Sequence, residues 1–388
     1  AELIIGRHTR SNVVNALQSI SSGQVAKITG TAVGIAGMIT AGLILCFYAI
    51  VAGWMIAFMF EPVMSLLGLP ELGSWLTDFR LARNIGFSAL FILMTVLIIS
   101  AGVEQGIEKW SSRLMPSLFV LLFGLILYVL TQDGAIEGLR HYLVPDFSQM
   151  TNPKLIVSAM GQAFFSMSLG VGTMLIYGSY IRKDENLPVV GALVTLTDTS
   201  VAFLAGLLVL PAIFVAQNLG VTIYTEAGTL IAGPDLIFQV LPALFEGMGS
   251  AGLLVGFAFF VLMSIAAVTS SISMLEVPVS YAVEQHTVGR VKATWLVGLI
   301  IFAISATISL NFDSLFGFVI TLTTERAQPL LSMVLCIFAG WIFYRNSILQ
   351  ELKEGSPQVE QGLFWKVWPV YVKFFCPALI LLTFAQGL

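Results

Sequence analysis

The chain has 388 residues, of which 57 % are hydrophobic and only 10 % are charged, and its mean hydropathy is +0.93. Because soluble domains carry about 25 % charged residues, this composition excludes a soluble enzyme, a secreted disulfide scaffold and a nucleic-acid-binding protein. The formal net charge of −4 is too small to indicate a charged partner. Cys46, Cys336 and Cys376 lie far apart in apolar stretches, which predicts buried small side chains rather than metal ligands or disulfide partners.

Before the first apolar segment, the chain opens with Ala-Glu-Leu-Ile-Ile-Gly-Arg, and we interpret residues 1–6 as the last turns of a helix. The beginning of that helix would lie outside this sequence. Residues 7–30 are then predicted to form a loop. The glycines of Gly30-x-x-x-Gly34 predict close helix packing, since no strand precedes them as in a phosphate-binding loop.

Nine apolar segments follow, and each is long enough to cross about 30 Å of hydrocarbon. They cover residues 31–60, 84–103, 113–131, 155–180, 188–215, 249–282, 291–310, 314–344 and 364–386. None shows the alternating pattern of a transmembrane β-barrel strand. The predicted fold class is therefore an all-α polytopic membrane protein, with residues 1–388 forming one transmembrane domain.

Basic residues in the loops predict the orientation of these segments. With the N-terminal side in the cytoplasm, four basic residues fall outside: Arg80, Arg83, Arg140 and Lys154. Twelve fall inside: Arg7, Arg10, Lys27, Lys109, Arg113, Arg182, Lys183, Arg290, Lys292, Arg345, Lys353 and Lys366. This bias predicts a multi-pass protein of a bacterial inner membrane with a cytoplasmic N-terminal side.

The segment 155–180 contains Gly161-Gln-Ala-Phe-Phe-Ser-Met-Ser-Leu-Gly-Val-Gly172 near its middle. Glycines and hydroxyls interrupt an otherwise apolar helix there. Irregular backbone at membrane depth is tolerated only where protein or a water-filled cavity satisfies its polar groups, and many transporters bind their substrates at such breaks. The alternative is a kinked helix whose serine hydroxyls bond back to its own carbonyl groups.

Two further features stand out against the apolar background. Ala266-Ala-Val-Thr-Ser-Ser271 offers hydroxyl and carbonyl oxygens that suit a hard cation such as sodium, although Ser and Thr also join membrane helices. Ionisable groups occur at membrane depth, where they are functional candidates: Asp198, Glu276, Glu325 and Arg326, with Glu276 close to a cytoplasmic end. The three histidines lie in loops, which makes an intramembrane hydrolase or zinc site improbable.

These motifs resemble the neurotransmitter:sodium symporter family, in particular its bacterial amino-acid transporters with the leucine-transporter fold. Glu2–Arg7 looks like the cytoplasmic end of the family's second helix, and Phe47-Tyr48 with Gly53-Trp54 matches its third. The other matching motifs are Gly161–Gly170 and Tyr180–Asp184 in the sixth helix and its loop, Asp198-Thr, Ala205-Gly and Pro211-Ala in the seventh, and Thr269–Ser271 in the eighth.

The resemblance implies two inverted five-helix repeats with an amino acid and two sodium ions bound at the midplane. It implies that Tyr48 donates to the substrate carboxylate and that Phe165 closes over the substrate. The side-chain pocket would be lined by Ile44, Ser168, Val171, Ser271 and Met274. The sodium ligands would be Ser166 at the first site and the Ala266 carbonyl, Thr269 and Ser270 at the second. Asp198 would supply negative charge near the first sodium, so that chloride is not required, although Thr197 is the alternative at that position.

Some features depart from the family. The first helix and most of the second are expected to lie outside this N-terminally truncated sequence. Phe316 occupies the place of the outer-gate aspartate, with Asp313 about one turn earlier, and Thr321–Pro329 is unusual for the tenth helix.

The predicted function is sodium-coupled symport of a neutral, bulky hydrophobic amino acid, not enzymatic catalysis. Expected partners are the amino acid, sodium and the lipid bilayer but no nucleic acid, and a homodimer is left open. The alternative is a transport-dead relative that acts as a membrane sensor or interaction protein. A channel is disfavoured, since the spans lack a continuous polar stripe.

Overall fold

The computed structural model describes residues 1–388 except 151, 226–229, 232, 287 and 387–388. Among the described residues, the one β feature is an isolated bridge between Tyr224 and Leu230. The α-helices are α1 (Glu2–Thr9), α2 (Val13–Ser19), α3 (Gln24–Leu66), α4 (Pro70–Thr77), α5 (Leu81–Ser100), α6 (Lys109–Val129), α7 (Ala135–Leu143), α8 (Pro153–Ser166), α9 (Thr173–Tyr180), α10 (Leu187–Asn218), α11 (Leu241–Gly247), α12 (Ser250–His286), α13 (Arg290–Leu310), α14 (Phe312–Ile320), α15 (Gln328–Ile337), α16 (Arg345–Gly355), α17 (Leu363–Val370) and α18 (Cys376–Gln386).

Short π-helices and 3₁₀ turns join several of these helices. The π-helices are η1 (Val103–Glu108), η3 (Leu236–Val240), η4 (Thr321–Ala327), η5 (Phe338–Ile342) and η7 (Tyr371–Phe375), and the 3₁₀ turns are η2 (Phe147–Gln149) and η6 (Val359–Gln361). The unusual stretch around Glu325 thus forms a π-helix between α14 and α15. π-Helical turns inside long helices often mark functional positions.

Seven helices within the described residues are long and apolar enough to cross a membrane, and a bent pair adds an eighth. That pair consists of Phe312–Ile342 and α16, which meet at 97°. The remaining predicted segment, 155–180, the fourth along the chain, is divided into α8 and α9, so the predicted interruption of this helix is confirmed. The other predicted segments each coincide with helices whose ends differ by a few residues.

The predicted loop over residues 7–30 is wrong for most of its length. The helix α1 continues to Thr9, α2 occupies the middle, and α3 begins at Gln24. Asn12 starts α2, since its side chain accepts hydrogen bonds from the backbone amides of Val14 and Asn15. A Cβ on Gly34 would lie 2.8 Å from the Cα of Val14, which confirms that this glycine permits close packing of α3 on α2.

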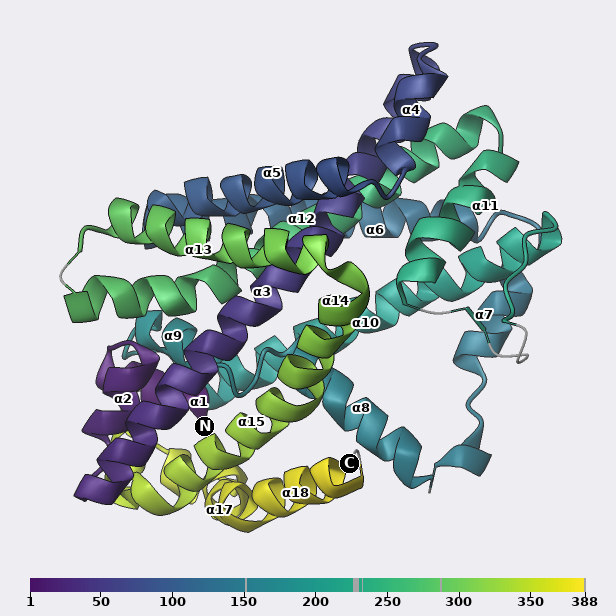
Figure 1. The fold of residues 1–388 in the computed structure, drawn as a ribbon. Coiled ribbons are helices and arrows are strands. Elements are labelled where there is room, and N and C mark those ends of the chain that lie inside the picture. Colours follow the sequence, from purple (N-terminus) through teal and green to yellow (C-terminus); the bar gives the residue numbers. More distant parts are fainter. Residues whose placement is uncertain (151, 226–229, 232, 287, 387–388) are drawn as a thin grey trace.

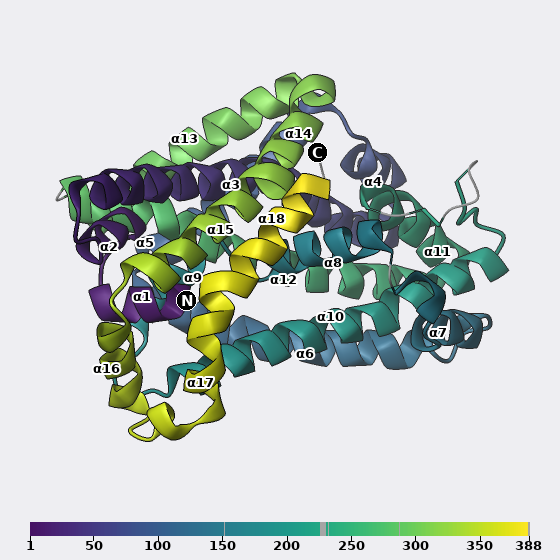
Figure 2. The ribbon, with the colours of Figure 1, turned by 90° about the horizontal axis from the view of Figure 1, so that it is seen from below.

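The long helices form a bundle in which α5, α6, α12 and α13 run in nearly the same direction and α3 crosses them obliquely (Figure 1). The short helices α4, α7 and α11 lie at one end of this bundle, whereas α2, α9 and α16 lie at the other (Figures 1 and 2). The apolar core runs between α3, α5 and α12, where Ile50, Phe91 and Ile272 have no exposed surface.

The end of the bundle with α1, α2, α9 and α16, here called the basic end, is held together by hydrogen bonds from arginine side chains. Arg7 is fully buried, and its guanidinium donates to Glu351 Oε1 at 2.6 Å and to the Glu185 carbonyl oxygen at 2.6 Å. Arg10 donates to the Ile181 carbonyl oxygen at 2.6 Å. These bonds join α1 to α16 and to the loop after α9, which places three loops predicted to be cytoplasmic at the same end of the molecule.

Glu276 also belongs to the basic end, and it is not solvated as its position near a helix end suggested. Its carboxylate has no exposed surface and accepts hydrogen bonds from Arg290 Nη1 at 3.0 Å and Nη2 at 2.5 Å. The Tyr180 hydroxyl donates to the same carboxylate at 2.5 Å. Because a buried charge is costly unless it is paired, this ion pair explains Glu276 as a structural link between α9, α12 and α13.

Candidate functional site

The candidate site is built around the interruption between α8 and α9. Three residues within this short stretch have positive φ: Ser168 at 49°, Gly170 at 84° and Gly172 at 85°. Left-handed backbone cannot continue a right-handed helix, so α8 ends at Ser166 and α9 begins at Thr173. The carbonyl end of α8 carries a partial negative charge and the amide end of α9 a partial positive charge.

Polar groups from distant parts of the chain surround this interruption. The Gly170 amide donates to Glu2 Oε1 at 2.9 Å, and Gln328 Nε2 donates to the Phe164 carbonyl oxygen at 2.8 Å. Glu2 Oε2, Gln328 Oε1 and the Ser332 hydroxyl are buried without a hydrogen-bond partner among the described residues. Sequence reasoning missed Gln328 and Ser332 as site residues and gave Glu2 no role beyond marking a helix end.

Asp198 contacts the end of α8, as the resemblance implied. The Ser166 hydroxyl donates to Asp198 Oδ1 at 2.8 Å, which joins α8 to α10. Thr197, the alternative at this position, is exposed on the neighbouring part of α10. A carboxylate, a hydroxyl and the negative end of a helix thus converge here, an arrangement that favours a cation.

A second group of oxygens lies on α12. Ala266, Thr269 and Ser270 are partly exposed, whereas the neighbouring residues Ala267, Val268 and Ser271 are buried. Thr269 Oγ1 donates to the Ala266 carbonyl oxygen at 2.9 Å. Two of the three predicted ligands of the second sodium are therefore in contact on one face of α12, where their oxygens suit a hard cation.

Tyr48 on α3 lies next to this group, since its phenol interacts with the Ser270 side chain. Its ring lies 6.3 Å from that of Phe91, measured between centroids. The phenol predicted to bind a substrate carboxylate and a hydroxyl predicted to bind sodium are thus neighbours. Such an arrangement would place a carboxylate ligand beside a cation, where their opposite charges attract.

The predicted pocket-lining residues differ in their surroundings. Ile44, Val171 and Met274 are buried apolar side chains with 2 %, 1 % and 6 % of their surface exposed, whereas Phe165 and Ser168 are partly exposed. The Ser271 hydroxyl has no exposed surface and lies 2.8 Å from Thr95 Oγ1 on α5. It therefore contributes to packing of α12 against α5.

The far end of the bundle has an aromatic cluster where the family has its gate aspartate. The Phe316 ring stacks on Phe312 with centroids 4.4 Å apart, and Phe316 lies 6.2 Å from Trp54. Glu325 and Arg326 are exposed on η4. Phe316 therefore packs into an aromatic cluster with Phe312 and Trp54.

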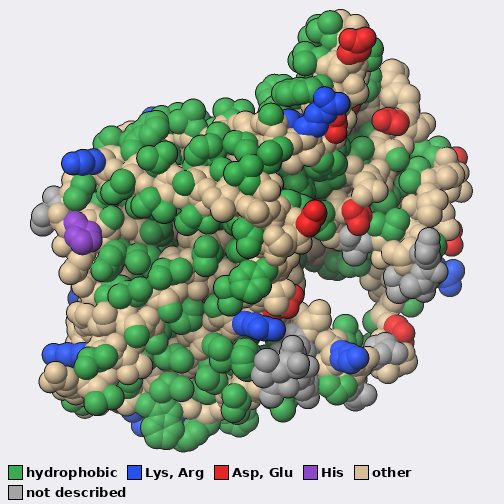
Figure 3. All heavy atoms as spheres, viewed as in Figure 1, with side chains coloured by type: hydrophobic (Ala, Val, Ile, Leu, Met, Phe, Trp, Pro, Cys, Tyr) green, Lys and Arg blue, Asp and Glu red, His purple; other side chains and the backbone are tan. Residues whose placement is uncertain are grey.

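The candidate residues form two groups that no described hydrogen bond or ion pair connects. One group consists of Ser166 and Asp198 on α8 and α10, and the other of Tyr48, Thr269 and Ser270 on α3 and α12. On the face shown in Figure 3, hydrophobic side chains cover most of the surface, and charged side chains gather at its margins and around a hollow. Exposed apolar residues such as Val120 and Leu299 fit a surface that faces lipid.

The sequence of this chain is similar to those of several known proteins. The profile of the Sodium:neurotransmitter symporter family matches residues 83–388. The uncharacterized sodium-dependent transporter YhdH of Bacillus subtilis is 31 % identical over 398 residues, covering 99 % of this chain and 84 % of YhdH. An uncharacterized sodium-dependent transporter of Haemophilus influenzae is 30 % identical, covering 100 % of this chain and 86 % of its own length.

More distant relatives and a solved structure agree with these matches. The sodium-dependent nutrient amino acid transporter 1 of Drosophila yakuba is 26 % identical over 77 % of this chain and 46 % of its own length. The crystal structure of MhsT in complex with L-phenylalanine is 33 % identical and superimposes with a TM-score of 0.84, covering 100 % of this chain and 87 % of MhsT. The predicted leucine-transporter-type fold is confirmed by this likeness.

Proposed function

The chain belongs to the sodium:neurotransmitter symporter family, and on that premise we propose that it couples uptake of a neutral, bulky hydrophobic amino acid to sodium entry. The proposed location is a bacterial inner membrane with the basic end in the cytoplasm, as the bias of basic residues favours. The observation that carries the proposal is the contact between Ser166 and Asp198, 2.8 Å apart, at the end of the interrupted helix. A carboxylate at membrane depth needs a cation nearby, and sodium is the cation that the family carries.

The proposed first sodium site uses Ser166 and Asp198, and the proposed second site uses the Ala266 carbonyl, Thr269 and Ser270. In each group the oxygens already approach one another, at 2.8 Å between Ser166 and Asp198 and 2.9 Å between Thr269 and Ala266. A bound sodium ion would take the place of each of these hydrogen bonds. The hydroxyl would turn its proton away, and both oxygens would then contact the ion. With Asp198 supplying fixed negative charge, chloride is not needed to balance two cations.

Thr269→Ala should raise the sodium concentration for half-maximal uptake about tenfold, equivalent to about 1.4 kcal/mol. It removes one of the few oxygens on this face of α12 while the helix keeps its backbone hydrogen bonds. Thr307→Ala is the matched control, because Thr307 on α13 makes the same kind of bond to a carbonyl four residues earlier, at 2.8 Å. An unchanged sodium dependence in Thr269→Ala would place the second sodium elsewhere.

The proposed substrate pocket combines the Tyr48 hydroxyl with apolar walls from Ile44, Val171 and Met274. No acidic or basic side chain belongs to this set, so it offers no partner for a charged substrate side chain. Val171 is small and Met274 is adaptable, which favours a bulky hydrophobic side chain. The similar protein MhsT was crystallised with L-phenylalanine, which has that chemistry.

Competition of labelled leucine uptake by each of the twenty amino acids tests this pocket. Membrane vesicles should be prepared from cells that express the natural gene. Vesicles from cells that lack this gene are the control. We expect strong competition by leucine, methionine and the aromatic amino acids. Competition by lysine or glutamate, with none from the hydrophobic amino acids, would refute the proposed substrate class.

The alternative function is a transport-dead relative that senses or binds an amino acid. The aromatic packing of Phe316 in place of an acidic gate is the observation that favours it. Sodium-dependent binding of leucine without any accumulation inside the vesicles would support the sensor, whereas accumulation supports the symporter.

A further inference from the structure

A large groove at the basic end lies apart from the candidate transport site. It has a volume of about 1120 Å³ and lies between the first turns of α3, the segment from α15 to α16, and the helices α17 and η7. Pockets for drug-sized ligands have about 300–1,000 Å³, so this groove suits a larger occupant. Its lining includes Trp341, Trp365, Trp368 and Tyr344. Aromatic rings of this kind are typical of the boundary between hydrocarbon and headgroups.

The charges that line the groove are all positive. Lys373 and Arg345 are its two charged lining residues, and neither an aspartate nor a glutamate lines it. Lys373 Nζ lies 4.0 Å from the centre of the Trp341 ring, and the Arg345 guanidinium lies 5.3 Å from that of Trp365. No ion pair within the described part of the chain involves either residue.

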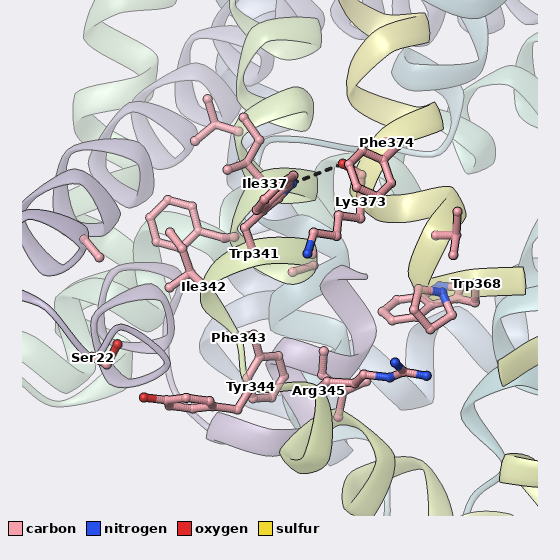
Figure 4. Close-up of a pocket in the computed structure, with 18 of the residues that line it drawn as sticks. Ser22, Ile337, Trp341, Ile342, Phe343, Tyr344, Arg345, Trp368, Lys373 and Phe374 are labelled. Carbon is pink, nitrogen blue, oxygen red and sulfur yellow. Dashed lines mark hydrogen bonds between the residues drawn. The ribbon is translucent and has the colours of Figure 1, made fainter. Parts of the chain in front are cut away.

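Figure 4 shows how the two cations lie relative to the groove. The Lys373 side chain leaves η7 and extends beneath Trp341 into the open space, and Arg345 lies across that space on the side of Trp368 (Figure 4). The Trp341 indole donates to the Lys373 carbonyl oxygen at 3.2 Å, which fixes η5 against η7. The aromatic contacts hold the cations in place but leave their positive charge without a counter-ion.

We propose that this groove binds one anionic phospholipid of the adjacent leaflet, with its phosphate between Lys373 and Arg345. The acyl chains would lie along the apolar part of the lining, where Val25 and Val370 are 79 % and 51 % exposed. An anionic headgroup is favoured over a zwitterionic one because the lining carries two cations and no carboxylate. The inference requires only that the chain spans a membrane, so it does not depend on which substrate is carried.

Lipid binding can be measured on the purified protein in detergent by native mass spectrometry, with phosphatidylglycerol or phosphatidylcholine as the probe. We expect the native protein to retain one phosphatidylglycerol in preference to phosphatidylcholine. The double substitution Lys373→Gln and Arg345→Gln should lower the apparent affinity for phosphatidylglycerol about thirtyfold, from the typical contribution of two basic residues near a membrane surface. Equal retention of the two lipids, or an unaffected double variant, would overturn the proposal.

Matched controls separate this site from general attraction to basic residues. Lys366→Gln removes an exposed lysine of α17 that does not line the groove, and it should leave retention unchanged. Lys373→Arg keeps the charge and should bind normally. If the double variant does not fold, raising potassium chloride from about 0.05 M to about 0.5 M should release phosphatidylglycerol from the native protein. Phosphatidylglycerol that stays bound at high salt would refute binding by charge. Displacement of phosphatidylglycerol by an equal concentration of soluble glycerol 3-phosphate would refute binding of a membrane lipid.

Discussion

Asp198→Ser should abolish sodium-driven uptake in chloride-free buffer. Asp198 accepts a hydrogen bond from Ser166 at 2.8 Å beside the carbonyl end of α8, and it is the carboxylate of that group. Removing its charge leaves sodium with neutral oxygens alone, so the attraction between opposite charges at this position is lost. The native protein should transport equally well in chloride and in gluconate, because the carboxylate supplies the balancing charge.

The control for this substitution is Thr197→Ala, which changes the adjacent exposed residue of α10. It should alter uptake by less than about twofold. Uptake by Asp198→Ser that returns when chloride is added would support the same account, since the anion would replace the lost carboxylate. A binding readout separates this effect from misfolding: sodium should raise the melting temperature of the native protein and of Thr197→Ala, and it should raise that of Asp198→Ser by a smaller amount, because only the second proposed site remains. A native protein that stops transporting in gluconate would contradict the assignment.

Gly170→Ala should eliminate uptake by distorting the interruption between α8 and α9. A Cβ at this position would lie 2.3 Å from the Ser332 hydroxyl and 2.5 Å from the Gln328 carbonyl oxygen. The residue also has φ of 84°, which an L-residue with a side chain rarely adopts. Steric overlap and left-handed strain together should cost about 2–5 kcal/mol of folding free energy.

Gly161→Ala in the preceding helix, α8, is the matched control. A Cβ on Gly161 meets no atom within 4 Å, and the residue lies inside α8. Alanine there should leave uptake intact and raise stability by about 0.5–1 kcal/mol, because it lowers the entropy lost on helix formation. Thermal unfolding of the two variants in the same detergent measures both effects. A Gly170→Ala protein as stable and active as the native one would show that the interruption tolerates a side chain.

The apolar pattern predicted most of the helices, because a membrane span must form its backbone hydrogen bonds within the helix and must be apolar over about twenty residues. An apolar run of that length is easily recognised in a sequence. The interruption in 155–180 was also predictable, since glycines and hydroxyls stand out in an apolar helix. The segment 7–30 was mispredicted because α2 is short and amphipathic signals are weak over seven residues. It is stabilised by packing against α3, which local sequence does not reveal.

The candidate site was predicted less completely than the fold. Consecutive residues of a helix point about 100° apart, so Thr197 and Asp198 could not both face Ser166, and only the packing of α10 on α8 distinguishes them. Glu2, Gln328 and Ser332 reach the interruption from segments far away in sequence. No local sequence motif identifies these three residues, because they have in common only that the fold brings them close to Gly170.

Accumulation of labelled leucine in vesicles that contain the natural gene product tests the central claim most directly. An inward sodium gradient should be imposed in gluconate buffer, with an equal potassium gradient as the comparison. The account predicts transient accumulation above the external concentration with sodium and none with potassium. Equal uptake under the two gradients would contradict sodium-coupled symport.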